Sequence, residues 1–318
     1  MSSQETPLIS ILIPTFNRKL YISECIYSAL GQDFENFEIV IVDNCSDDGS
    51  WEVCKQIAGV YPKVRLFRNE CNIGPVKNWI RCAELARGKY SKILFSDDCL
   101  RVDCLSEMVN ELRNESIGFV FSGALIGSNR LASNATYINP SFRLTTADSY
   151  IDGVLNGNFP FSPGAVLLRT VDLRNNLSDF FLTSTPQPFD MHGAGPDVLL
   201  LFKTADNYEY VAHIPKPLVY FRSHSESFTI SNKDDLVQQG YISAISYYLK
   251  FTRRERAWYR YVSCKWLRTV VCFKRIPDPP SFLRKYEGTG VPLETLRLMY
   301  EVIMQCFFRV FGKRRSYV

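Results

Sequence analysis

The stretch FEIVIVDNCSDDG, residues 37–49, decides the fold. Its first six residues form a nearly continuous apolar run rich in β-branched side chains, which is typical of a strand buried on both faces of a parallel sheet. The run ends at Asp43 in a loop of turn-forming residues, and the apolar spacing beyond it predicts a helix from about Ser50 to Val60. A strand that leads through a polar loop into a helix is the repeating unit of α/β proteins.

Similar units lie on both sides of this stretch. Gly88 is expected to end the last of their helices. Four units in about the first 100 residues predict a mostly parallel sheet with helices on both faces, and such sheets bind ligands at the carboxyl ends of their strands. The flanking units are predicted as strands 9–13, 64–67 and 90–95 and helices 21–30 and 76–86.

The rest of the chain has weaker patterns. Residues 211–221 are expected to form an edge strand at best, because Pro215 and Pro217 have no N–H to donate to a sheet. The other predicted elements are strands 117–121 and 165–168, loops 129–139 and 178–195, and helices 236–251 and 255–273.

Composition indicates a globular protein with a basic end. Hydrophobic residues make up 46% of the 318 residues and charged residues 22%, which excludes a disordered chain. The ten cysteines lack the spacing of a zinc site and are expected to be buried thiols in a reducing compartment. The net charge of +4 combines a balance of +11 in residues 250–318 with −7 elsewhere. We expect a catalytic domain over residues 1–230 and a basic helical C-terminal region over residues 231–318.

The basic region predicts an anionic partner for that end of the chain. Residues 293–311 have the spacing of an amphipathic helix, and Lys313-Arg314-Arg315 follows. Such a helix either lies on an anionic membrane surface or packs on the catalytic domain or a second subunit, and both interpretations stay open. The polar first residues and the lack of a long apolar run predict a cytoplasmic protein, peripheral at the inner face of the membrane if the tail binds there.

Asp97 and Asp98 follow the apolar strand KILF directly. Adjacent carboxylates repel each other unless a cation or hydroxyl groups compensate them, and oxygen ligands suit Mg²⁺ or Mn²⁺. The alternative is a role in capping the next helix, but Asp103 already fits that role.

Two further polar clusters follow strand ends. Asp43 can accept a hydrogen bond from a base N–H or a ribose hydroxyl, whereas Asp47 and Asp48 are expected only to shape the loop. After the third strand come Asn72 and Gly74, where glycine permits a ligand to approach the backbone. Lys77 lies just inside the next helix and can meet a pyrophosphate there, although a single lysine is more often a surface charge.

Several enzyme classes are excluded by missing motifs. No Gly-x-Gly-x-x-Gly follows the first strand, and no Gly-Lys-Ser/Thr phosphate loop occurs. No serine lies in a nucleophile elbow. Dinucleotide enzymes, P-loop phosphotransferases and serine hydrolases are therefore not expected, and no module for binding nucleic acid is found.

Four short segments in this order resemble glycosyltransferase family 2. They are PTFNR at 14–18, IVDN at 41–44, NIG at 72–74 and FSDD at 95–98. The resemblance covers about residues 7 to 125 and continues more weakly to about 230. It implies an α/β fold of the GT-A type, which is Rossmann-like, and a non-processive enzyme that inverts the anomeric centre, since the Gln-x-x-Arg-Trp element of processive members is absent.

The resemblance also implies roles for the polar residues. Thr15 and Asp43 would contact the base or ribose, and Asp97 and Asp98 would form the metal and ribose site. Since Asn44 and Phe95 replace aspartates of many members, Asp98 and the diphosphate would hold the ion, and dependence on Mg²⁺ or Mn²⁺ is expected to be weaker than usual. The full set for the nucleotide-sugar is Pro14, Thr15, Asn17, Arg18, Asp43, Asn72, Gly74, Lys77, Asp97 and Arg222, and the set for the metal is Asp98 and His224.

The family's general base is an aspartate that begins a late helix. Asp197 in GPDVLLL fits this position, although a first-turn acid that complements the helix dipole gives the same pattern. Asp190 is the reserve candidate. Arg222 and His224 resemble the Arg-x-His segment that closes the family's sites, where Arg222 would bind the diphosphate and His224 the metal; a purely structural loop pair is the alternative.

These inferences predict a glycosyltransferase that moves one sugar from a nucleotide-diphosphate sugar to an acceptor hydroxyl. The expected acceptor is a glycan or lipid-linked glycan in the synthesis of a cell-surface polysaccharide or lipopolysaccharide, such as O-antigen or capsule. The alternatives are an inactive nucleotide-binding module and a membrane-associated scaffold.

Overall fold

The computed structural model describes residues 6–129, 133–139, 141, 143–177, 193–224, 236–254, 256–258 and 260–261. The chain divides into two compact units, Met1–Val237 and Gln238–Val318. The helix α10 (Leu236–Phe251) begins at the boundary and provides most of the described part of the second unit. Predicted helix 255–273 lies almost entirely outside the described residues, as do residues 262–318 with their basic tail.

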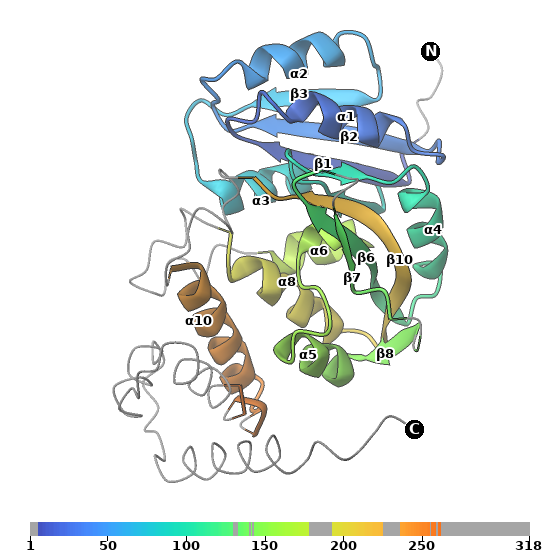
Figure 1. Cartoon of the computed structure of the whole chain (residues 1–318), viewed down its shortest axis with the longest axis vertical. Coiled ribbons are helices and arrows are strands. Elements are labelled where there is room, and N and C mark those ends of the chain that lie inside the picture. Colours follow the sequence, from blue (N-terminus) through green and yellow to red (C-terminus); the bar gives the residue numbers. More distant parts are fainter. Residues whose placement is uncertain are drawn as a thin grey trace. The chain divides into compact units, whose positions relative to one another are not determined.

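The first unit is built on one mixed sheet in which ten strands are described (Figure 1). The strand order is β3-β2-β1-β4-β9-β6-β10-β5, with β7 paired to β6 and β8 to β10. The strands are β1 (Ile9–Thr15), β2 (Phe37–Asp43), β3 (Val64–Arg68), β4 (Tyr90–Ile93), β5 (Cys99–Leu100), β6 (Ile117–Gly127), β7 (Asn134–Thr136), β8 (Leu144–Thr146), β9 (Val166–Arg169) and β10 (Tyr210–Arg222).

Helices cover both faces of this sheet. On one face α1, α2 and α4 pack on alternate strand residues such as Ile11 and Ile41. On the other face α3 packs on β1 and β2, and α5, α6 and α8 lie along the remaining strands. The helices are α1 (Ile22–Leu30), α2 (Ser50–Ala58), α3 (Pro75–Leu85), α4 (Cys104–Glu111), α5 (Ala147–Leu155), η1 (Pro163–Ala165), α6 (Thr170–Asn176) and α8 (Pro196–Ala205).

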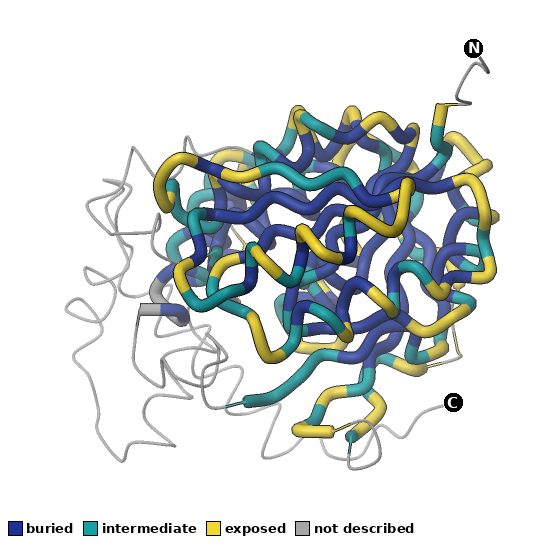
Figure 2. Tube along the Cα trace, turned by 90° about the horizontal axis from the view of Figure 1, so that it is seen from above, coloured by how far each residue is buried: buried dark blue, intermediate teal, exposed yellow. Residues whose placement is uncertain are grey.

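The first four strands confirm the predicted architecture. β1 pairs in parallel with both β2 and β4, and β2 pairs in parallel with β3. All residues of β1 and β2 are buried, which explains their continuous apolar sequences (Figure 2). The α/β fold with a mostly parallel sheet at its core therefore follows from sequence alone.

Residues 210–222 correct the prediction of an edge strand. β10 lies inside the sheet, parallel to β6 on one side and antiparallel to β8 and β5 on the other. Its register against β6 shifts between Ile214 and Pro217. Because β8 pairs with residues 210–212 and β5 with residues 219–220, the two prolines fall in the gap between these partners. The β-bulge in that gap interrupts the regular pairing, so the N–H groups that the two prolines lack are not required there.

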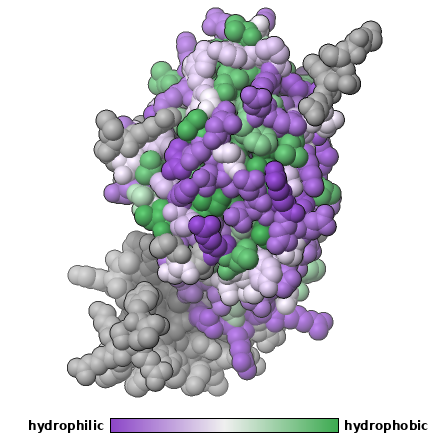
Figure 3. Space-filling model, turned by 90° about the vertical axis from the view of Figure 1, so that its right-hand side faces the viewer, coloured by the Kyte–Doolittle hydropathy of each residue, from purple (hydrophilic) through white to green (hydrophobic). Residues whose placement is uncertain are grey.

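Other predicted bounds shift more modestly. The strand predicted at 117–121 continues to Gly127 as β6, and the predicted loop 129–139 contains the short strand β7. Most of the predicted loop 178–195 is outside the described residues. The face of the molecule in Figure 3 is mostly hydrophilic, with its apolar residues in small separate groups.

Gly88 does not end α3 in the predicted way. The helix ends at Leu85, with Ala86 as the capping residue. Gly88 instead lies against β1, where a Cβ atom would be 2.6 Å from the backbone nitrogen of Ser10. Its own N–H donates to the Ser10 hydroxyl at 2.9 Å. The glycine is needed because the two backbones approach so closely.

We therefore expect Gly88→Ala to lower the free energy of unfolding by roughly 1–3 kcal/mol, since neither backbone can move without disturbing the sheet. Gly59→Ala is the matched control, because a Cβ at Gly59 would meet its neighbours at ordinary distances of 3.4 Å or more. Urea unfolding of both variants measures the difference. Equal stability of the two variants would contradict this role of Gly88.

Candidate nucleotide-sugar site

The pairing of the first strands brings three polar strand ends to one edge of the sheet. Thr15 of β1 lies opposite Asp43 of β2, and Asp43 lies opposite Arg68 of β3. On the other side of β1, Leu12 lies opposite Ile93 of β4, three residues before the turn that carries Asp97 and Asp98. The residues predicted from separate motifs are thus neighbours at the carboxyl edge.

Asp43 is fully buried at this edge. One carboxylate oxygen, Oδ2, accepts a hydrogen bond from the Ser46 N–H at 3.1 Å and lies 3.2 Å from Nε of Arg68. The other oxygen, Oδ1, is buried and has no hydrogen-bond partner among the described residues. A buried acceptor without a partner is costly, so it marks a place where a ligand donor fits. Arg68 was not predicted, although its place at the end of a strand is the same signal that identified Asp43.

Asn44 organises the loop after β3. Its amide NH₂ donates to Asn72 Oδ1 at 2.8 Å and to the Gly74 carbonyl, and its Oδ1 accepts from the Ile73 N–H at 3.0 Å. Asn69 donates to the same Oδ1 at 2.8 Å. The Gly74 carbonyl requires a donor and the Ile73 N–H requires an acceptor. An asparagine side chain supplies both, whereas an ionised aspartate supplies only acceptors. The departure from the family pattern at this position therefore has a structural reason.

Asn72 and Gly74 close the same loop. Asn72 Oδ1 accepts from the Gly74 N–H at 2.9 Å, and Gly74 has a positive φ of 84° that favours glycine. The predicted pair is therefore next to Asn44, and its side-chain contacts hold the loop in shape.

The loop after β1 joins the two halves of the edge. Asn17 and Asp47 exchange hydrogen bonds, with Asn17 Nδ2 donating to Asp47 and Asn17 Oδ1 accepting from the Asp47 N–H. The N–H of Arg18 donates to Ser50 at 2.8 Å, while its guanidinium Nε lies 3.1 Å from Asp97 Oδ2. These bonds hold the loop in shape, and Asp48 adds to them by accepting from the Ser50 N–H. Pro14 is buried within β1 and pairs with Val42.

Asp97 and Asp98 lie in a tight turn in which the Asp98 N–H donates to the Phe95 carbonyl at 2.9 Å. The Asp97 carboxylate contacts Arg18 and His224, both through Oδ2 at 3.1 Å. Asp98 is buried, and its Oδ1 accepts from the Arg222 N–H at 2.9 Å. The end of β10 is therefore held on the turn, and the two motifs that were predicted to meet do so.

The Arg222 side chain is enclosed by groups that the sequence did not reveal. Its Nε donates to the Asp97 carbonyl at 3.0 Å, and its Nη2 forms an ion pair with Glu24. The guanidinium lies over the rings of Tyr21 and Tyr220, at 5.2 and 5.3 Å from their centroids. Tyr21 also packs on the His224 ring, with 4.5 Å between centroids. Tyr21 and Glu24 belong to the start of α1, where no motif pointed to the site.

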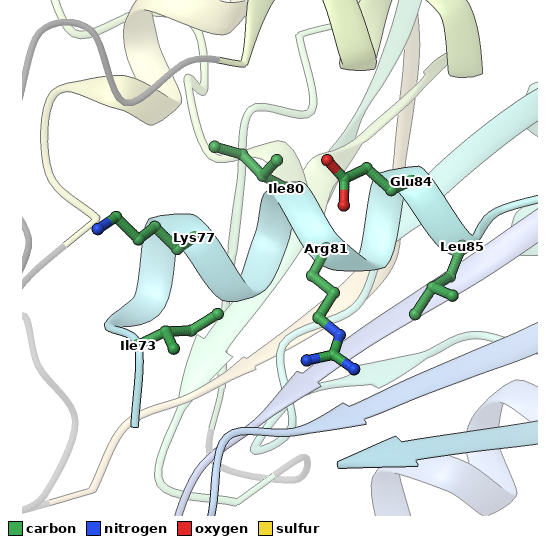
Figure 4. A pocket seen from close by; sticks show the side chains of 6 residues that line it. All are labelled: Ile73, Lys77, Ile80, Arg81, Glu84 and Leu85. Atoms are coloured by element: carbon green, nitrogen blue, oxygen red, sulfur yellow. The ribbon is translucent and has the colours of Figure 1, made fainter. Parts of the chain in front are cut away.

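Lys77 is not brought into this cluster. It is exposed in the first turn of α3, and the hydrogen bonds and ion pairs among the described residues do not involve it. It lines an open hollow of about 490 Å³ along α3, together with apolar residues and the charged pair Arg81 and Glu84 (Figure 4). Arg81 points from this hollow to the Asn69 side chain, which connects the hollow to the loop of Asn44.

Asp197 is buried at the start of α8. Its Oδ1 accepts from the N–H groups of Gly195 and Val198, both at 2.8 Å, so it stabilises the first turn of its own helix. Gly193, shortly before Asp197 in the sequence, lies against Trp79, since a Cβ at Gly193 would be 2.0 Å from the Trp79 ring. The Trp79 ring packs in turn on Phe95, which stands next to the turn of Asp97 and Asp98. The reserve candidate Asp190 lies outside the described residues.

The acidic groups at this edge do not form a complete metal site by themselves. Within the described residues, no group of three His, Cys, Asp or Glu side chains is arranged to hold an ion. Of the predicted ligands, Asp98 accepts from the Arg222 N–H and His224 contacts the Asp97 carboxylate. An ion here would need oxygen atoms from a ligand as well.

The comparisons with known proteins identify the family. A model of glycosyl transferase family 2 matches residues 10–172, just over half of the chain and including every strand end described above except that of β10. The chain belongs to this family. The match confirms the resemblance drawn from the four short segments.

Relatives that are named as glycosyltransferases match part of the chain. The abequosyltransferase RfbV of Salmonella typhimurium is 38% identical over 112 residues, which are 34% of this chain and 34% of that protein. A GalNAc(5)-diNAcBac-PP-undecaprenol beta-1,3-glucosyltransferase of Campylobacter jejuni is 31% identical over 121 residues, 38% of this chain and 39% of that one. The chain spans about half the length of the curated relatives it matches.

Solved structures share the fold. The crystal structure of S. aureus TarS 1-349 in complex with UDP-GlcNAc matches with a TM-score of 0.56 at 15% identity, over 98% of this chain and 93% of that one. This likeness confirms the predicted GT-A-type architecture. In the described residues, no helix has both the length and the apolar character needed to span a membrane.

The burial of Asp98 leads to a pH-dependent prediction. Burial, and next the Asp97 carboxylate, raise the pKa of Asp98 well above its usual value. The folded protein therefore holds this proton more tightly than the unfolded chain, so the free energy of unfolding falls as the pH rises through the unfolded pKa towards the folded one. Asp98→Asn removes the ionisable group and with it this loss. We expect the free energy of unfolding of the variant to exceed that of the wild type by on the order of 1 kcal/mol near neutral pH.

Urea unfolding between acidic and neutral pH measures this difference. Asp103→Asn is the control, because Arg101 lowers the pKa of Asp103, so its ionised form stabilises the fold slightly and the substitution gives no gain. An Asp98→Asn protein that is less stable than the wild type at neutral pH would show that the charge of Asp98 does not destabilise the ligand-free protein.

Proposed function

We propose that this protein transfers one sugar from a nucleotide-diphosphate sugar to an acceptor hydroxyl. Membership of family 2 supports the reaction class, and the observation that carries the proposal is the buried, unpartnered Oδ1 of Asp43 at the same edge as Asp97 and Asp98. Asp43 would accept a hydrogen bond from a ring N–H of the base. Thr15, Asn17, Asn72 and Gly74 would line the nucleoside, as their places at the ends of β1 and β3 suggest.

The diphosphate would lie at the Asp97–Asp98 turn. A divalent cation, Mg²⁺ or Mn²⁺, would supply positive charge against the developing negative charge of the departing diphosphate. Asp98 and His224 would hold it and the diphosphate would complete its ligands, since no three His, Cys, Asp or Glu side chains of the described part of the chain are arranged to hold an ion. Arg18 and Arg222 both contact this turn and would face the diphosphate, and Lys77 in the first turn of α3 is a further candidate for it.

Asp197 would take the proton of the acceptor hydroxyl as the new bond forms. Its burial at the start of α8 and the packing of Gly193 and Trp79 against Phe95 support a place close to the donor. The names of the relatives suggest the acceptor, since they include an abequosyltransferase and a glucosyltransferase whose name contains an undecaprenol-linked glycan. We therefore propose a lipid-linked or surface-polysaccharide acceptor met at the cytoplasmic side of the membrane.

A panel of UDP-, GDP- and dTDP-sugars tests the proposal directly. We expect Mn²⁺-supported hydrolysis of sugars on one nucleotide, because water can replace the missing acceptor. Binding of a nucleoside diphosphate in calorimetry without any turnover would instead favour the inactive nucleotide-binding module. A protein that binds none of the three diphosphates with Mn²⁺ present would favour the scaffold and remove the proposal.

Asp43→Asn should weaken binding of the nucleoside diphosphate by about tenfold or more, roughly 1.4 kcal/mol, because it removes the negative acceptor and the ion pair with Arg68. Asp47→Asn is the control, since Asp47 is exposed and bonds only within the loops. Calorimetric titration of both variants measures the affinities. If both bind as tightly as the wild type, the base does not lie at Asp43.

Asp197→Asn should lower kcat by about 10²–10⁴-fold while nucleotide binding stays unchanged. The asparagine oxygen can still accept from Gly195 and Val198, so the helix start is preserved and lost activity reports the missing base. Steady-state kinetics and the calorimetric affinity separate the two effects. Unchanged kcat would rule out Asp197 as the base and leave Asp190 to be tested.

A further inference from the structure

Asn69 is a buried polar residue directly after β3, and it joins three parts of the structure. Its backbone N–H donates to the Asp43 carbonyl at the end of β2 at 2.8 Å. Its side chain is withdrawn from water, and its amide NH₂ donates to Asn44 Oδ1 at 2.8 Å and to Asn78 Oδ1 at 2.9 Å. Asn69 therefore connects the loop after β2 and the helix α3 to the end of β3.

The neighbours of Asn69 determine how its side-chain amide is oriented. Asn44 donates to the Gly74 carbonyl and accepts from the Ile73 N–H. Asn78 donates to a backbone carbonyl of β2 at 3.0 Å. Since backbone groups cannot exchange donor for acceptor, they fix which atom of each neighbouring amide is the oxygen. Both neighbours thus present an acceptor to Asn69, which must turn its NH₂ towards them and its own oxygen away.

Arg81 supplies the donor that the oxygen of Asn69 requires. Its Nη1 donates to Asn69 Oδ1. Arg81 is half-buried on α3, where it lines the open hollow and extends from it towards the end of β3 (Figure 4). A buried acceptor without a partner is costly, and a charged donor forms a stronger bond than a neutral one. The guanidinium therefore stabilises the one orientation of the Asn69 amide that satisfies both of its neighbours.

This network extends to the loops of the candidate site. Asn44 donates to Asn72 Oδ1 at 2.8 Å, and the same oxygen accepts from the Gly74 N–H at 2.9 Å. On the other side, the N–H of Asn69 holds the backbone of Asp43, whose buried Oδ1 has no hydrogen-bond partner among the described residues. The shape of the loops after β2 and β3 therefore depends on the orientation of a single buried amide.

We propose that Arg81 and Asn69 are positioning residues of the donor site, which hold the loops after β2 and β3 in the shape that binds the nucleoside. This inference rests on the proposed function, because the same loops are proposed to line the nucleoside. Arg81 acts through Asn69 from the hollow along α3, and neither residue has to touch the donor. The role concerns affinity for the nucleoside rather than the chemistry at the turn of Asp97 and Asp98.

Amide hydrogen exchange measured by NMR on the ligand-free full chain tests the positioning without a ligand. The N–H groups of Ile73 and Gly74 are the reporters, because they donate to side chains of this network. In Arg81→Met, which keeps an unbranched side chain but has no donor, both should exchange about tenfold faster or more, since the Asn69 oxygen loses its partner. Arg81→Lys keeps a charged donor and should stay within about threefold of the wild type.

Calorimetry with nucleoside phosphates measures the consequence for binding. For whichever of UDP, GDP and dTDP the wild type binds, Arg81→Met should weaken the affinity by about tenfold, and that for the monophosphate of the same base by the same factor. A residue that bound the diphosphate itself would affect the diphosphate more. Asn69→Asp should also weaken both, because an aspartate has no N–H to donate to Asn44 and Asn78.

Arg113→Met is the matched control, since Arg113 is exposed just after α4 and should change neither exchange nor affinity. Near-UV circular dichroism shows whether the variants are folded. A folded Arg81→Met protein in which Ile73 and Gly74 exchange as in the wild type would overturn the proposal, and so would equal effects of Arg81→Met and Arg81→Lys on affinity.

The wild type alone decides if the variants do not fold, because unprotected exchange of Ile73 and Gly74 in the wild type also overturns the proposal. If the wild type binds none of the three diphosphates, the proposed function itself fails, whereas the exchange measurement still shows whether Arg81 holds the loops.

Discussion

The candidate site depends on the parallel pairing of β1 with β2 on one side and with β4 on the other. Because parallel strands end at the same edge, this pairing gathers Asp43, Asp97 and Asp98 from positions more than 50 residues apart in the sequence. The loop after β1 then joins the two groups, since Asn17 bonds to the loop of Asp43 while Arg18 contacts Asp97. The proposed donor residues at the ends of β1, β2 and β4 take their places from this pairing, and the end of β10 adds Arg222 and His224 through contacts with Asp98 and Asp97.

Gathering carboxylates in a buried edge is unfavourable, and the protein compensates each of them separately. Arg68 contacts Asp43, Arg18 and His224 contact Asp97, and the Arg222 N–H donates to Asp98. At Asp43 the compensation is incomplete, because one oxygen has no hydrogen-bond partner among the described residues. At Asp98 burial disfavours the ionised form, which raises the pKa of the carboxyl group. Incomplete compensation of buried acids is typical of sites that bind a ligand.

Sequence alone was sufficient for the features that depend on local pattern. Continuous apolar runs such as residues 37–42 identify buried parallel strands, and a polar residue at the end of such a run belongs to the ligand edge. The contributions of Glu24 and Tyr21 depend on which elements pack together, and a residue at the start of a helix carries no signal of that. Pro215 and Pro217 were misleading because a bulge and a gap between β8 and β5 accommodate them. The proposed roles of the site residues remain predictions.

Hydrogen exchange of the protein with Mn²⁺ and the nucleoside diphosphate that it binds shows whether one ligand spans this edge of the sheet. A single ligand that spans the edge should protect two separate segments together, the loop of residues 43–47 and the turn of residues 95–98, while the far end of the sheet near Glu38 and Arg87 stays unchanged. Protection of only one of the two segments, or of neither, would show that the carboxylates do not share one ligand and would contradict the account.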